Sequence, residues 1–165
     1  MNIREIATLW YYKELWGWDL EKTGSKNPQK DLEIFLKTIL IAANGDGKLT
    51  SEERDWVIGR AAVSGASDEL LQELETYEAN EDIVELVAPL GNSKFRRAII
   101  YFAIQAAAAD GDYNDEEKKV VRIASSAMGV SEEVVAEIET LYFEEQSLKE
   151  KRINLCFPDG NPFAQ

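Results

Sequence analysis

The sequence contains one eight-residue motif twice, as DGKLTSEE at residues 46–53 and as DGDYNDEE at residues 110–117. Both copies follow the pattern Asp-Gly-x-apolar-(Thr/Asn)-x-Glu-Glu, and their first aspartates lie 110 − 46 = 64 positions apart. Each copy separates two segments whose apolar residues have helical spacing. The motif therefore predicts two similar breaks between helices, and the function of the chain depends on what these breaks do.

The segments around the two breaks also resemble each other. The apolar stripe of Phe35, Leu36, Ile39, Leu40 and Ala43 is followed 64 positions later by Ile99, Ile100, Ala103, Ile104 and Ala107. Residues 42–76 align with residues 106–140 without a gap, and thirteen positions are identical. No strand-like alternation occurs. We predict an all-α fold, a single globular domain of about seven or eight helices with an internal pseudo-two-fold repeat.

The domain boundaries follow from this repeat. The helical domain is expected at residues 30–145, with repeat halves at about 32–78 and 96–142. Residues 1–29 would form an aromatic N-terminal helix and a polar connector, and residues 146–165 a C-terminal tail. Three tryptophans, Trp10, Trp16 and Trp18, mark the N-terminal segment. They either pack onto the domain or form a surface for an unknown protein partner, which includes a possible homodimer.

Composition excludes several classes of function. The net charge is −13, which disfavours nucleic acid because its binding requires basic residues at the phosphates. The chain has no histidine, so Ser-His-Asp and Cys-His catalysis and ordinary zinc sites are excluded, and we expect no enzyme and no organic cofactor. We find neither a signal peptide nor a transmembrane segment, and Cys156 is the lone cysteine. We expect a soluble, cytoplasmic protein.

One interpretation of the breaks is structural. Thr50 and Glu53 have the spacing of a capping box, in which the hydroxyl and the carboxylate each accept a hydrogen bond from the other residue's amide. Asn114 and Glu117 have the same spacing. In this interpretation the chain is a scaffold or dimerisation domain, and its acidic residues only cap helices and keep the protein in solution.

The other interpretation is cation binding. The order of aspartate, glycine and glutamate resembles part of a calcium-binding EF-hand loop, but alanines occupy the first ligand position in both copies, so neither loop is a complete site. A pseudo-symmetric domain could bring the breaks together and combine four carboxylates in one weak, partly hydrated site for Ca²⁺, Mg²⁺ or Mn²⁺. The predicted ligands are Asp46, Glu53, Asp110 and Glu117.

The two breaks and their flanking residues, 42–53 and 106–117, resemble the tellurite-resistance TerB-like family over roughly residues 30–145. The resemblance implies an all-helical domain with internal two-fold symmetry. It also implies an acidic, metal-binding surface in a protein of tellurite and general stress resistance, often part of a membrane-associated assembly. Only the four carboxylates just named carry over to this sequence.

Overall fold

The computed structural model of the chain describes residues 1–23 and 29–164. These residues form nine α-helices and one short 3-10 helix, and they contain no strand, which confirms the all-α class. The elements are α1 (Ile3–Trp16), α2 (Leu20–Thr23), α3 (Gln29–Ala43), α4 (Ser51–Val63), α5 (Asp68–Thr76), α6 (Ile83–Val87), η1 (Ala88–Leu90), α7 (Arg96–Ala107), α8 (Asp115–Ala127) and α9 (Glu132–Cys156).

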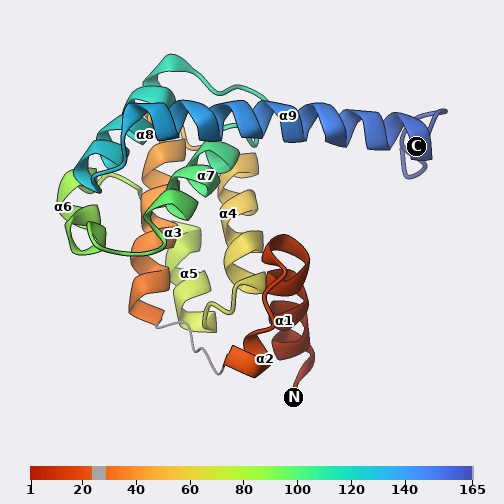
Figure 1. Cartoon of the computed structure of the whole chain (residues 1–165), viewed down its shortest axis with the longest axis horizontal. Coiled ribbons are helices and arrows are strands. Elements are labelled where there is room, and N and C mark those ends of the chain that lie inside the picture. Colours follow the sequence, from red (N-terminus) through yellow and green to blue (C-terminus); the bar gives the residue numbers. More distant parts are fainter. Residues whose placement is uncertain (24–28, 165) are drawn as a thin grey trace.

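The core forms between α3 and α7, the pair of helices with the most extensive contact (Figure 1). Their predicted apolar stripes face each other: Leu36, Ile39 and Leu40 from α3 and Ile99 and Ile104 from α7 are fully buried. Helices α4, α6, α8 and α9 cover this pair. The helical spacing read from the sequence therefore located the centre of the fold correctly.

The outer helices differ more from the expectation. The polar connector expected before residue 30 contains α2, α3 already begins at Gln29, and residues 24–28 lie outside the described part of the chain. Helix α1 starts with a capping box between Asn2 and Glu5 and contacts α4, but it contributes no buried residue. Helix α9 continues without a break past residue 146, where the tail was expected, to Cys156. No helix in residues 1–23 or 29–164 is long and apolar enough to cross a membrane.

The end of α5 depends on one arginine of α4. The Arg54 guanidinium donates to the carbonyl oxygens of Leu74 at 2.6 Å and Tyr77 at 2.9 Å, and these carbonyls have no partner further along the helix. We expect Arg54→Ala to lower the free energy of unfolding by about 1–2 kcal/mol in urea denaturation, because it removes two charge-assisted hydrogen bonds. Asp55→Ala, at the exposed neighbouring position, should change it by less than about 0.5 kcal/mol. Equal effects of the two substitutions would contradict this assignment.

Candidate functional site

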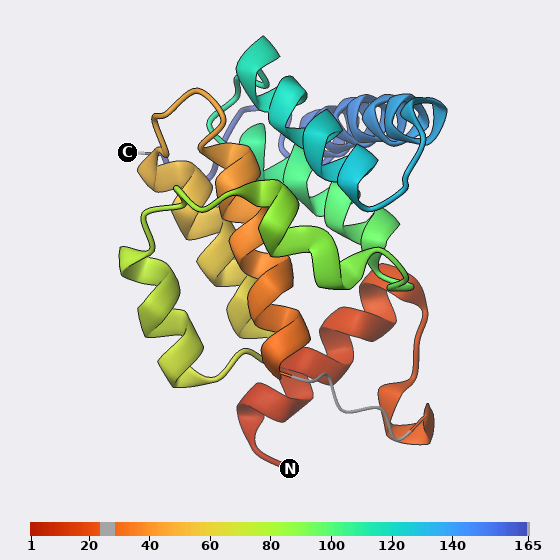
Figure 2. The same ribbon diagram turned by 90° about the vertical axis from the view of Figure 1, so that its left-hand side faces the viewer.

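The two repeated breaks lie against each other at one end of the molecule (Figure 2). A side chain at Gly45 would place its Cβ only 2.7 Å from the Cα of Glu117, so the backbones of the two motifs are in direct contact. The Asn114 side-chain amide also donates to Asp46 Oδ2 at 3.4 Å. The chain therefore brings the two motifs together, as the cation-binding interpretation requires.

The glycines of the motif have two different roles. Gly47 and Gly111 adopt left-handed backbone angles, with φ of 81° and 96°, as a turn after a helix predicts. Gly45, which precedes the first motif, does not have a positive φ. It is needed instead because only a residue without a side chain allows the backbone of α8 to approach so closely.

Both predicted capping boxes are present. Thr50 Oγ1 accepts a hydrogen bond from the Glu53 amide at 3.2 Å, and the Glu53 carboxylate accepts one from the Thr50 amide at 2.7 Å. In the second copy, Asn114 Oδ1 accepts from the Glu117 amide at 3.0 Å, and the Glu117 carboxylate accepts from the Asn114 amide at 2.9 Å. Each glutamate thus fixes the start of its own helix through one carboxylate oxygen.

The same two glutamates form a buried acid pair. Glu53 is 1% exposed and Glu117 is 2% exposed. Each of the two carboxyl groups affects the pKa of the other, because both are buried where the two motifs meet. Burial raises the pKa of both groups above the ordinary value of 4.5, and it raises the pKa of Glu117 to about 8. We infer from these shifts that the pair shares one proton between the two motifs at neutral pH.

The two aspartates lie outside the acid pair, on the surface. Asp46 Oδ1 accepts from the Lys48 amide at 2.8 Å, and Asp110 Oδ1 accepts from the Asp112 amide at 2.9 Å, so both carboxylates stabilise their own turns. The charge of Asp110 adds to the increase in the pKa of Glu53, and the charge of Asp46 acts likewise on Glu117. The four predicted ligands therefore share one electrostatic environment, with two inside and two at the rim. Over residues 1–23 and 29–164, no three or more Asp, Glu, Cys or His side chains are grouped as a metal requires.

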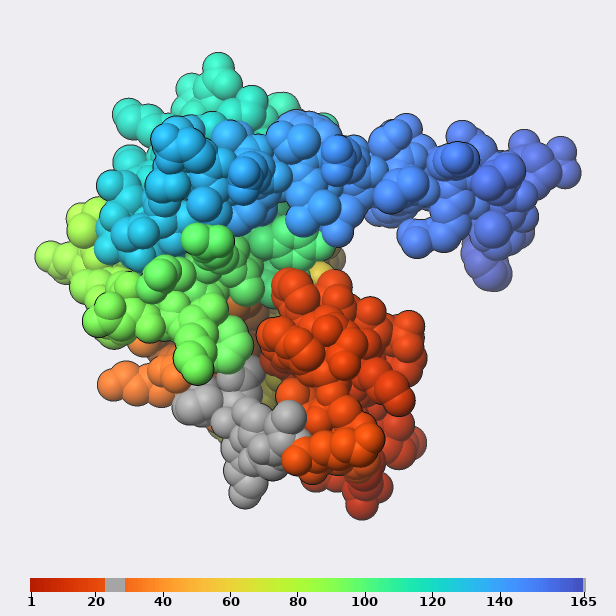
Figure 3. Space-filling model, in the orientation of Figure 1, coloured from red at the N-terminus to blue at the C-terminus, as the bar shows by residue number. Residues whose placement is uncertain are grey.

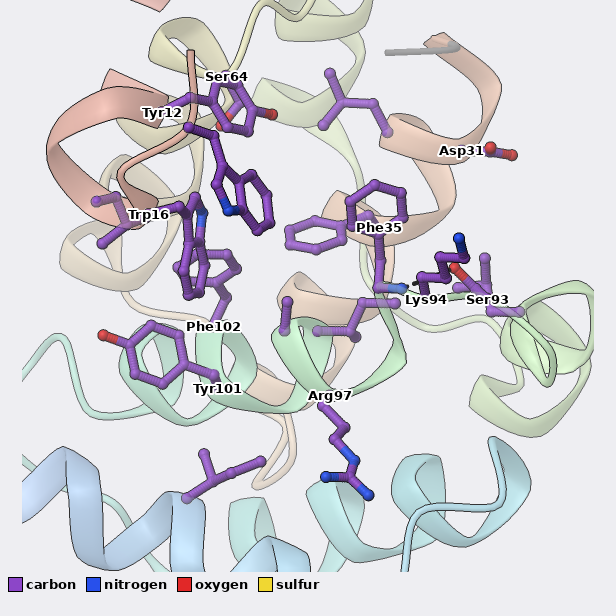
Figure 4. Close-up of a pocket in the computed structure, with 18 of the residues that line it drawn as sticks. Tyr12, Trp16, Asp31, Phe35, Ser64, Ser93, Lys94, Arg97, Tyr101 and Phe102 are labelled. Carbon is purple, nitrogen blue, oxygen red and sulfur yellow. Dashed lines mark hydrogen bonds between the residues drawn. The ribbon is translucent and has the colours of Figure 1, made fainter. Parts of the chain in front are cut away.

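Sequence reasoning missed a second site, an apolar cavity of about 810 Å³ between α1, α3, α7 and α9. Figure 4 shows Tyr12, Trp16, Phe35 and Phe102 gathered around it. Trp16 stacks on Trp18 with ring centroids 5.4 Å apart, and both line the cavity, whereas Trp10 is 61% exposed and does not. The three tryptophans therefore do not form one surface, because two of them line the cavity and Trp10 lies outside it. A protein partner that binds them stays a prediction.

Arg60 of α4 connects α1 to the body of the protein. Its guanidinium carbon lies 4.0 Å from the ring centre of Phe102 and 4.6 Å from that of Trp56, and it donates a hydrogen bond to the Tyr11 hydroxyl. Burial lowers the pKa of Arg60, and the aromatic ring faces partly offset the loss of water. The contact between Arg60 and Trp56 could have been predicted from the sequence, because residues four positions apart lie on the same face of a helix.

The family model described as "Tellurite resistance protein TerB" matches residues 34–140. The crystal structure of a tellurite resistance protein from Nostoc punctiforme PCC 73102 is 32% identical to this chain, with a TM-score of 0.81, and the match covers 99% of each chain. No curated protein matches the sequence. These two findings confirm the resemblance inferred from the repeated motif: the chain belongs to the TerB family of tellurite resistance proteins.

Proposed function

We propose that the chain is a non-enzymatic, cytoplasmic module of tellurite and stress resistance that binds a divalent cation weakly where the two motifs meet. The observation that carries this proposal is the acid pair itself. Capping requires each glutamate only at the start of its own helix, and it does not require two carboxyl groups to be buried in contact with each other. Burial of two such groups is costly unless a proton or a cation separates them.

In this proposal a cation replaces the shared proton. Glu53 and Glu117 would supply two carboxylates from the two motifs, while Asp46 and Asp110 at the rim would contribute charge and contacts through water. The donors are all oxygen, which suits Ca²⁺, Mg²⁺ and Mn²⁺. The tellurite anion would be repelled by the same charges, so the site favours a cation over the oxyanion.

Titration calorimetry of the full chain with Ca²⁺, Mg²⁺ and Mn²⁺ tests this proposal. We expect dissociation constants of about 10⁻⁴ to 10⁻³ M, as for sparse calcium sites. Binding should be tighter at pH 8.5 than at pH 6, because a proton competes with the cation below the pKa of Glu117, which is about 8. Replacement of Glu117 by Gln should abolish the heat of binding.

The matched control is Asp115→Asn, which removes an equal charge from an exposed carboxylate of the same helix. It should leave the binding constant nearly unchanged. Absence of any heat or melting shift at about 5 mM cation and pH 8.5, well above the expected constants, would exclude cation binding. The remaining function would then be that of a scaffold, which the two complete capping boxes already favour as the second candidate.

A further inference from the structure

The last part of α9 projects beyond the rest of the molecule. We call residues 146–156 the arm (Figures 1 and 3). Leu148 is 64% exposed and Leu155 is 73% exposed, and the only buried residue described in the 25-residue helix is Val135, near its start. A short helical segment that is exposed on most of its surface is only marginally stable in water by itself. The arm therefore needs a surface that covers its apolar residues.

The apolar residues of α9 form a seam with a period of seven. Leu141, Leu148 and Leu155 lie seven positions apart, and Val134 begins the same series. The positions three before each leucine are Ile138, Glu145 and Arg152. This is the a and d pattern by which two helices pack along their length. The pattern is typical of a helix that packs against another helix, and in α9 it continues beyond the part that packs on α7 and α8.

The body of the protein leaves space for such a partner along the seam. Val134, Ile138 and Leu141 line the apolar cavity of about 810 Å³. A second hollow of about 830 Å³ continues under the arm and is lined by Trp56, Asp110, Leu148 and Arg152 among others. Glu145 lines both hollows, so they follow one face of α9. The notch between α1 and α9 is visible in Figure 3.

The charges within the seam select the partner. Glu145 and Arg152 are its two charged core positions. Two parallel copies of α9 would place Glu145 against Glu145 and Arg152 against Arg152, which is unfavourable. Two antiparallel copies bring Glu145 of one chain to Arg152 of the other, so the seam is complementary to itself only in that direction.

We propose that two copies of this chain associate through antiparallel α9 helices, and that the arm of each fills the hollows of the other. When Glu145 of one copy lies opposite Arg152 of the second copy, Leu155 of one copy comes beside Leu141 of the second copy, at the apolar cavity. The arm also carries Lys149, Lys151 and Arg152, and these favour its approach to a body whose chain has a net charge of −13. A two-fold axis beside the arms makes the two contacts identical, and the interface closes with two chains.

Light scattering coupled to size-exclusion chromatography tests the proposal on the full chain. At about 100 µM, where interfaces of micromolar affinity are saturated, we expect twice the chain mass of 18.6 kDa. The double variant Leu148→Glu/Leu155→Glu should give 18.6 kDa with an unchanged circular dichroism spectrum, because both side chains are mostly exposed in the single chain. Phe143→Glu is the control, since Phe143 is 57% exposed on the opposite side of α9 and should leave the dimer intact. A monomeric wild type, or a dimer that survives the double variant, overturns the proposal.

Charge reversal tests the direction of the helices. Glu145→Arg or Arg152→Glu alone should weaken the dimer by about tenfold or more, and the two together should restore it. Tyr101→Phe controls for the hydrogen bond that Glu145 accepts from the Tyr101 hydroxyl, and it should retain the dimer. Oxidation should not link the two chains through Cys156, because antiparallel arms hold the two thiols at opposite ends of the interface. Rapid formation of a Cys156–Cys156 disulfide, or no restoration by the double reversal, would exclude the antiparallel pair.

Discussion

Substitution of Gly45 by alanine is expected to destabilise the chain by roughly 3 kcal/mol. The new Cβ would lie 2.7 Å from Glu117 Cα and 3.1 Å from the carbonyl oxygens of Ala42 and Glu116. All three are backbone atoms, so no side-chain rotation can relieve the overlap, and the two motifs must separate. Urea denaturation followed by circular dichroism measures the loss of stability.

Gly59 provides the control for this substitution. It lies within α4, and a Cβ there would meet no atom within 4 Å. Gly59→Ala should therefore stabilise the chain by about 0.5–1 kcal/mol, because alanine favours the helix and restricts the unfolded chain. If Gly45→Ala has a similarly small or favourable effect, the close contact between the motifs does not exist in solution.

Stability should fall as the pH rises from 6 to 9, by about 2 kcal/mol after allowance for solvent screening. The reason is that burial raises the pKa of Glu117 from 4.5 in the unfolded chain to about 8 in the folded protein. Between these values the folded state holds a proton that the unfolded state has lost, so stability is greatest below the window, decreases through it and becomes level above pH 8. The melting temperature in buffers from pH 6 to pH 9 reports this change.

The variant Glu117→Gln should remove this pH dependence. Its amide can donate to Glu53 in place of the acid proton, and its oxygen can still accept from the Asn114 amide, so the capping box is preserved. We expect a flat profile and a higher melting temperature than wild type at pH 9. Glu116→Gln changes the exposed neighbour and should keep the slope. A flat profile for the wild type would show that the two glutamates do not share a proton.

Much of this site could be predicted from the sequence, because its features depend on local chemistry. Capping boxes require only a hydroxyl or amide residue and a glutamate three positions later, and both were correctly predicted. The stripes of α3 and α7 follow directly from helical spacing. That the motifs meet depended on the repeat, which suggested a symmetric arrangement. The contact is present, while the pseudo-two-fold symmetry itself stays a prediction.

The remaining features depend on contacts between segments that are distant in sequence. The burial of Glu53 and Glu117 could not be predicted, because an acidic residue at the start of a helix is ordinarily exposed. Both become buried only through the contact between the two motifs. The apolar cavity requires the aromatic residues of α1 to lie over α7, and no local pattern fixes where α1 packs. Residues 146–165 were expected to form a tail, although the seven-residue period continues to Leu155 within α9.

The proton between Glu53 and Glu117 restricts which amino-acid substitutions the two motifs can accept. One carboxyl group comes from each copy of the motif, so a substitution in one copy alters the ionisation of a residue in the other. Loss of either glutamate to a side chain that cannot hydrogen-bond would leave its counterpart buried beside an unsuitable neighbour. A change in one copy is therefore tolerated only where the new side chain, such as glutamine, can still donate a hydrogen bond to the glutamate of the other copy.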